Sequence, residues 1–320
     1  MNTEIVGTRR SYWIGAGSLV VSWFAAAIIN SLMNALNARG FSGEELLYFR
    51  SLPCMAVAFI AIRSTVMEMD TYSHKACAAV AISSIMFYES MAVWKAVIPV
   101  IVLIALMPVV NIFLARRDGK KITILAYVSA LLLVGGVAWS LDPFSQPFSK
   151  AGMILALGCV IVSSVGFDMW SKTGRTVTLW HKGFWLGVYT TLFAILVVGS
   201  RHLVGALMGN AVVPISVEFG KYDDPTVQRY LWIFTIFAVV YIYSTIVPFT
   251  RIGKMDVVHA SIMLQGATPA SLIGSWLIID ERIKMWQIPG IICALIGATL
   301  VTVQLIRAPA VVSSPAARPG

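Results

Sequence analysis

The chain has 320 residues, of which 58% are hydrophobic and 12% are charged, and its formal net charge is +9. Soluble domains are typically about 45–50% apolar and about 25% charged, and a globule of this size could not bury so much apolar surface. The composition therefore excludes a soluble protein. The basic residues stand in short clusters between apolar runs, as in loops beside a bilayer, so the positive charge does not predict a nucleic-acid partner.

Ten apolar runs are long enough to cross a bilayer as helices, which takes about 20 mostly apolar residues. In chain order these runs are 12–34, 44–62, 75–93, 96–115, 122–140, 151–170, 182–200, 229–249, 257–279 and 287–306. The first run is longer than the apolar core of a secretory signal, so we interpret it as a retained helix that follows a short segment, 1–11. The tail, 307–320, is rich in Pro, Ala and Ser and is predicted to be disordered.

The distribution of lysine and arginine predicts an orientation. With the N-terminus inside, the cytoplasmic segments hold most of the basic residues, including the cluster Arg116, Arg117, Lys120 and Lys121. An even number of spans then places the C-terminus inside as well. We expect a multi-pass protein of a bacterial cytoplasmic (inner) membrane with both termini cytoplasmic.

The two halves of the chain share a pattern of punctuating residues. Pro108 and Pro269 are 161 residues apart, and so are Gly136 and Gly297. This offset predicts two five-helix repeats, over 12–140 and 151–306. Because five is odd, the repeats would have opposite orientations in the membrane, which is the plan of many secondary transporters.

Two stretches carry a resemblance to a known family. "YFRSLPCMAVAF" follows the start of the second run, and "ATPASLIGSWLIIDERIKMWQIPGIICALIGATLV" covers the ninth and tenth. Together with their order over ten runs, they resemble the drug/metabolite transporter superfamily, in its EamA-like ten-helix branch. The chain departs from the family pattern at Arg116, Arg117 and Asp118, where Glu-Arg is usual, and at His181 and Lys182, where the second repeat lacks the family's arginine.

The resemblance implies an all-α membrane protein with a central cavity on a pseudo-two-fold axis, opened alternately to each side. In that family helices one to four and six to nine surround the cavity, and helices five and ten lie at the periphery.

Ionisable residues inside apolar runs are costly and therefore candidate functional groups. Arg50 and Glu89 lie roughly 8–9 Å below the outer ends of their helices, at 1.5 Å per residue. Either Arg50 binds an anionic substrate group and Glu89 couples to a cation or proton, or the two form a structural ion pair. Asp168 is either a proton-handling carboxylate or an interfacial partner of Lys172. His259 either titrates near neutral pH or is a solvated residue at a helix start.

Polar and aromatic residues near mid-depth are the other cavity candidates. Tyr and Trp present apolar faces with one hydrogen-bonding group, and an amide in lipid has no water to pair with; the alternative for each is ordinary packing against a neighbouring helix. The predicted cavity residues are Trp23, Asn30, Arg50, Tyr88, Glu89, Tyr189, Tyr241, Tyr243 and Gln265. Tyr241 and Tyr243 point about 200° apart on a helix, so one of them is expected to pack elsewhere. Pro108 and Pro269 each remove a backbone hydrogen bond and are either hinges or static kinks.

No catalytic motif, metal-ligand spacing or ATP-binding loop is present, and the four cysteines are scattered. We therefore expect no enzyme activity, no metal and no cofactor. The sequence predicts a secondary active transporter that exports a small metabolite or drug by alternating access, with proton coupling through Glu89, Asp168 or His259. The alternatives are a membrane-embedded lipid-modifying enzyme and a non-transporting membrane subunit. The expected partners are a small-molecule substrate and the lipid bilayer, and the expected state is a monomer or homodimer.

Overall fold

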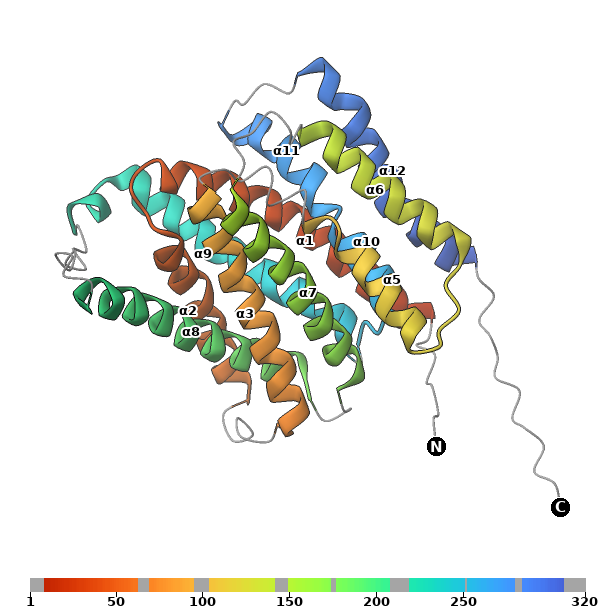
Figure 1. Cartoon of the computed structure of the whole chain (residues 1–320), viewed down its shortest axis with the longest axis horizontal. Helices are drawn as coiled ribbons and strands as arrows, with labels where there is room; N and C mark the ends of the chain where they lie inside the picture. The colour runs from red at the N-terminus through yellow and green to blue at the C-terminus, as the bar shows by residue number, and fades with distance from the viewer. Residues whose placement is uncertain are drawn as a thin grey trace.

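The computed structural model describes residues 9–62, 69–94, 104–141, 149–173, 177–207, 219–250, 252–279 and 284–307. Within these ranges the fold is all-helical (Figure 1). Five described helices are long and apolar enough to cross a membrane: Arg10–Asn37, Gly43–Ile62, Lys150–Lys172, Leu179–Ser200 and Pro225–Phe249. The predicted tail, 307–320, lies outside the described residues except for Arg307, and so does most of the predicted segment 1–11.

Each of the ten predicted runs overlaps a described helix. The α-helices are α1 (Arg9–Asn37), α2 (Gly43–Ile62), α3 (Thr71–Trp94), α5 (Met107–Arg117), α6 (Ile124–Leu141), α7 (Lys150–Lys172), α8 (Leu179–Leu207), α9 (Pro225–Ile246), α10 (Val257–Leu264), α11 (Ala267–Ile279) and α12 (Ile288–Arg307). Three short 3-10 helices join them: η3 (Phe219–Tyr222), η4 (Val247–Phe249) and η5 (Met285–Gln287). α8 extends seven residues beyond residue 200, where the seventh predicted run ends.

The ninth predicted run is not one continuous helix, because a turn at Gln265–Gly266 separates α10 from α11. Pro269 has no N–H to donate to the carbonyl of Gln265, and the N–H of Thr268 donates to it instead. At the break the carbonyl of Met263 accepts both the backbone N–H of Gly266 at 2.9 Å and the indole N–H of Trp23 at 2.5 Å. Pro108 stands in a similar place, in the first turn of α5 after a turn at Ala105–Leu106, where a missing N–H is tolerated.

The helices contact one another in specific pairs. α3 lies against α7, α1 against both α9 and α11, and α2 against α8, while α5 contacts α7 and α10. α6 and α12 pack on each other along their length and form one edge of the bundle in Figure 1.

Glycines allow the close approach of α6 and α12. A β-carbon added at Gly136 would lie 2.5 Å from the backbone nitrogen of Ala294 and 2.5 Å from the carbonyl oxygen of Gly290. One added at Gly297 would lie 2.6 Å from the carbonyl oxygen of Ser129. Small residues of this kind let helix backbones pack directly in a membrane.

Candidate functional site

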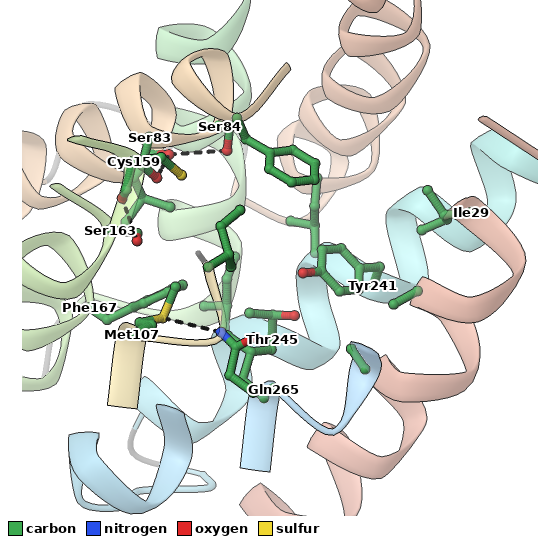
Figure 2. A pocket seen from close by; sticks show the side chains of 18 of the residues that line it. Ile29, Ser83, Ser84, Met107, Cys159, Ser163, Phe167, Tyr241, Thr245 and Gln265 are labelled. Carbon is green, nitrogen blue, oxygen red and sulfur yellow. Dashed lines mark hydrogen bonds between the residues drawn. The ribbon is translucent and has the colours of Figure 1, made fainter. Parts of the chain in front are cut away.

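A cavity of about 180 Å³ lies among the helices. It is lined by residues from every described α-helix except α6 and α12. Its polar lining residues are Asn30, Arg50, Ser83, Ser84, Tyr88, Ser163, Tyr241, Thr245, Gln265 and Thr268. Figure 2 shows the serines of α3 and α7 on one side of the cavity, facing Tyr241 and Thr245 of α9 on the other.

Arg50, on α2, supplies the charge of this cavity. Among the described lining residues it is the one with a permanent charge, and none of them is an aspartate or glutamate. Its guanidinium carbon lies 5.5 Å from the centre of the Tyr241 ring, which is within the range of a cation–π interaction. The Tyr88 hydroxyl is its hydrogen-bonding neighbour. Arg50 is half-buried because the cavity into which it points is itself open to water-sized molecules.

Gln265 lies in the turn that breaks the ninth run, so the break opens directly onto the cavity. Its amide nitrogen is 3.8 Å from the sulfur of Met107, at the start of α5, and Figure 2 shows the two side chains pointing toward each other. Asn30 donates to the hydroxyl of Ser271 at 2.8 Å, which fixes this amide between α1 and α11. Both predicted amide residues, Asn30 and Gln265, therefore line the cavity.

The lining hydroxyls were missed by sequence reasoning. Ser83 donates to the carbonyl of Val80 at 2.8 Å and Ser163 to that of Cys159 at 2.7 Å. Their protons are used within their own helices, which leaves hydroxyl lone pairs facing the cavity as acceptors. A serine in an apolar helix is usually a small packing residue, and its sequence position alone did not distinguish these.

Two predicted cavity residues serve as hydrogen-bonding supports outside the lining. Trp23 is buried and bonds to Met263, as described above. The hydroxyl of Tyr243 donates to the backbone carbonyl of Cys54 at 2.8 Å, which ties α9 to α2. Tyr241 lines the cavity and Tyr243 does not, as their spacing predicted.

Tyr189 and Glu89 also lie outside the lining. The hydroxyl of Tyr189 is 3.0 Å from Nδ1 of His74, in an aromatic group that joins α8 to α3. Glu89 is half-buried on α3, one residue beyond Tyr88.

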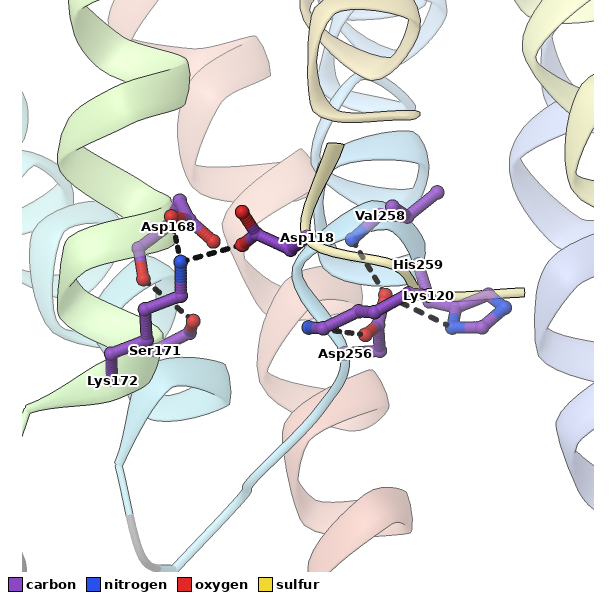
Figure 3. Close-up of polar contacts among 8 residues, drawn as sticks. All are labelled: Asp118, Lys120, Asp168, Ser171, Lys172, Asp256, Val258 and His259. Atoms are coloured by element: carbon purple, nitrogen blue, oxygen red, sulfur yellow. Dashed lines mark hydrogen bonds and ion pairs between the residues drawn. The ribbon is translucent and has the colours of Figure 1, made fainter. Parts of the chain in front are cut away.

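Asp168 belongs to an ion-pair cluster at the end of the bundle that we predicted to be cytoplasmic (Figure 3). The ammonium of Lys172 lies 2.5 Å from Asp168 and 2.7 Å from Asp118, in the connection after α5. The hydrogen bond from Lys172 to Asp118 holds the pKa of the Asp118 carboxyl below its ordinary value. The Lys172–Asp118 pair therefore stabilises the fold above about pH 4 and is lost as the pH falls through the depressed pKa.

His259 stands beside a second pair, on α10. Asp256 caps this helix by accepting from the N–H of Val258 at 2.9 Å, and Lys120 lies 3.4 Å from it. Nδ1 of His259 is 3.7 Å from the Asp256 carboxylate, which is beyond hydrogen-bonding distance. Lys120 and Asp118 are two residues apart, so one connection is tied to both α7 and α10 (Figure 3).

Lys182 is the most unexpected group. It is 1% exposed, and its ammonium donates to the backbone carbonyls of Trp170 at 3.1 Å and Phe249 at 2.5 Å. These carbonyls lie in the last turns of α7 and η4, and the rings of Phe167 of α7 and Phe249 of η4 stack on each other. Lys182 therefore joins three helices next to the cavity wall.

In the described part of the chain, no group of three His, Cys, Asp or Glu side chains is placed to hold a metal ion.

Comparisons with known proteins address the fold. No family model matches the chain, and no curated protein matches it. A protein of known crystal structure is similar, with a TM-score of 0.65 and 15% sequence identity over 93% of this chain and 99% of the other. This chain shares that protein's fold. At such an identity the likeness concerns the fold alone.

Proposed function

We propose that this chain is a secondary carrier of the EamA-like type, which moves a small metabolite across a membrane by alternating access. The observation that carries the proposal is the cavity, which every described α-helix lines except α6 and α12. Concave sites with apolar walls and a few convergent polar groups are the usual form of a small-molecule site. The absence of α6 and α12 from the lining agrees with the peripheral fifth and tenth helices of the family.

The pattern of helix contacts supports an inverted repeat. Exchanging the halves relates α1 to α7, α2 to α8, α3 to α9, α5 to α11 and α6 to α12. Under this exchange the α1–α9 contact becomes α7–α3, α1–α11 becomes α7–α5, and α3–α8 becomes α9–α2, and all of these contacts are present.

The glycine contacts support the same symmetry at the level of single residues. Gly136 faces Gly290 and Ala294 across the α6–α12 contact, and Gly297 faces Ser129 and Leu133. The offset of 161 residues converts the first set into the second. We therefore propose ten spans in two inverted repeats, with both termini in the cytoplasm of a bacterial cell.

Alternating access requires each end of the cavity to open in turn. At the end that we assign to the cytoplasm, Lys172–Asp118 and Lys120–Asp256 tie the α5–α6 connection to α7 and α10. At the other end, Lys221 of η3 lies 2.7 Å from Glu45 of α2. We propose that these ion pairs break and reform as the two ends exchange. Proton coupling through Glu89, Asp168 or His259 stays within this proposal, and a dependence of flux on a pH gradient tests it.

The carrier proposal predicts that a solute changes oppositely in the growth medium of deletion and overexpressing cells. Ser84→Trp fills the cavity from α3 and should abolish the overexpression effect. Ile82→Trp, on the same helix but 39% exposed, should leave it intact. Metabolite profiling of the medium, with membrane levels of each variant measured in parallel, makes the comparison. If no solute responds, or if both tryptophan variants behave alike at equal abundance, the carrier proposal is wrong.

A further inference from the structure

The cavity carries an unbalanced charge. Its described lining includes one arginine and no carboxylate, so the groups facing this space carry a net charge of +1. A charge away from bulk water is costly unless it is paired or hydrogen-bonded. Tyr241 and Tyr88 offset part of this cost through a ring face and a hydroxyl, and both are neutral. A ligand that brought one negative charge would complete the balance.

Arginine at this position favours a particular kind of anion. Its guanidinium presents donors in a planar fork that matches the two oxygens of a carboxylate. The Tyr241 ring, 5.5 Å from the guanidinium carbon, packs against the cation while leaving donors at its edge. The Tyr88 hydroxyl adds a further polar group at the same place. This end of the cavity is therefore arranged as the recognition point for a single acidic headgroup.

The remaining walls limit the rest of the ligand. They are largely apolar, with Ile29, Phe87, Met107, Phe167, Leu186 and Leu264 around the space. Its volume is about 180 Å³, and a cavity of about 150 Å³ is known to hold benzene. The space therefore suits a compact body of ring size with few polar groups, rather than a sugar or a nucleotide.

We propose that the cavity binds a small organic monocarboxylate, with its carboxylate on Arg50 and its apolar body against the opposite walls. The inference names the substrate class of the carrier proposed above and rests on that proposal. Serine and threonine hydroxyls along the walls accept any hydrogen-bond donors on the body of the ligand.

An isosteric series of probes tests the charge. Benzoate, benzamide and benzamidinium have nearly the same shape and carry charges of −1, 0 and +1, and inorganic phosphate supplies negative charge without an apolar body. Each is added to the purified full chain in detergent at matched ionic strength, with sodium chloride as the reference, and thermal unfolding is followed by tryptophan fluorescence. Because a ligand that binds only the folded state raises Tm, we expect benzoate to stabilise most, benzamide less, and benzamidinium and phosphate no more than the salt.

Variants of Arg50 test the site. Arg50→Gln should weaken the apparent benzoate affinity by at least about tenfold, which corresponds to about 1.4 kcal/mol, and remove the preference for benzoate over benzamide. Arg50→Lys keeps the charge without the fork and should retain part of the preference. Arg117→Gln, whose side chain is 67% exposed, is the matched arginine control and should bind as the wild type does.

The outcomes separate this inference from the carrier proposal. It is overturned if benzoate stabilises no more than sodium chloride, if benzamide or benzamidinium equals it, or if its effect survives in Arg50→Gln. Should Arg50→Gln fail to fold, the wild-type series and Arg50→Lys decide. Selective benzoate binding with no solute flux would instead overturn the carrier proposal. Flux of a neutral or cationic solute would overturn only the proposed substrate class.

Discussion

Gly136→Ala should destabilise the protein by about 1–3 kcal/mol, the usual cost of overpacking, whereas Gly135→Ala should be neutral or slightly stabilising. The new methyl group at Gly136 would meet backbone atoms of Gly290 and Ala294 at 2.5 Å, and backbone cannot rotate away as a side chain can. A β-carbon at Gly135 meets no atom within 4 Å. Unfolding in a graded series of sodium dodecyl sulfate concentrations, followed by circular dichroism, measures both variants.

The inverted repeat extends this prediction to the other half of the chain. Gly297→Ala should cost about as much as Gly136→Ala, because its methyl group would meet the carbonyl of Ser129 and the nitrogen of Leu133 at 2.6 and 2.7 Å. Equal stabilities of the Gly135 and Gly136 variants would show that α6 and α12 do not pack at this distance. A large effect at Gly136 with none at Gly297 would contradict the proposed symmetry.

Lys182→Ala should be the most destabilising substitution of a charged residue in the described chain. It removes two hydrogen bonds from an ammonium to the carbonyls of Trp170 and Phe249, and hydrogen bonds to charged groups contribute about 1.5–3 kcal/mol each. It also leaves space where a fully buried stem had packed. We expect a loss of at least about 3 kcal/mol, which the same unfolding series measures.

Lys172→Ala is the matched lysine control. Its side chain is 41% exposed, and the carboxylates of its partners Asp118 and Asp168 are 26% and 12% exposed. We therefore expect a loss above the about 0–1 kcal/mol of fully exposed pairs but below that of Lys182→Ala. Lys182→Met separates the packing of the stem from the loss of the donors, because methionine fills a similar volume without an N–H. If Lys182→Ala costs no more than Lys172→Ala, the lysine does not hold α7, α8 and η4 together.

Much of the helical arrangement follows from apolar length and charge. Every predicted run overlaps a described helix, because a run of apolar residues bounded by charges has few other stable arrangements in lipid. Pro269 and Gly136 also have direct structural consequences. A missing N–H accompanies the break between α10 and α11, and a missing side chain allows α6 and α12 to approach closely. Proline and glycine at these positions each recur at an offset of 161 residues, as Pro108 and Gly297.

The assignment of individual side chains to the cavity was less predictable. Tyr88, Tyr241 and Gln265 line it as expected, but Trp23, Tyr189 and Tyr243 bond to neighbouring groups outside the lining. Depth along a helix is readable from sequence, whereas the direction of a side chain around the helix depends on which neighbour it meets. The period of apolar residues that reveals this direction in soluble helices is weak when lipid covers one face and protein the other.

Lys182 shows the same limit. It stands at the edge of an apolar run, where a lysine ordinarily extends to the membrane surface. Its burial depends on the carbonyls of Trp170 and Phe249, which come from segments 12 and 67 residues away. The sequence signal for a buried lysine was its position within the apolar stretch "LWHKGFWL". The backbone carbonyls that accept its hydrogen bonds cannot be identified from the sequence.

Two-sided access to the cavity is the most direct test of alternating access. A chain with its four natural cysteines replaced carries Ser84→Cys, on the cavity wall, or Ile82→Cys, exposed on the same helix. Each is treated with a membrane-impermeant maleimide in sealed right-side-out and inside-out vesicles. We predict that the cysteine at position 84 is labelled from both sides, more slowly in the presence of benzoate, while the one at position 82 is labelled from neither. If position 84 were labelled in only one of the two kinds of vesicle, the cavity would open to one side of the membrane alone, which would contradict a carrier.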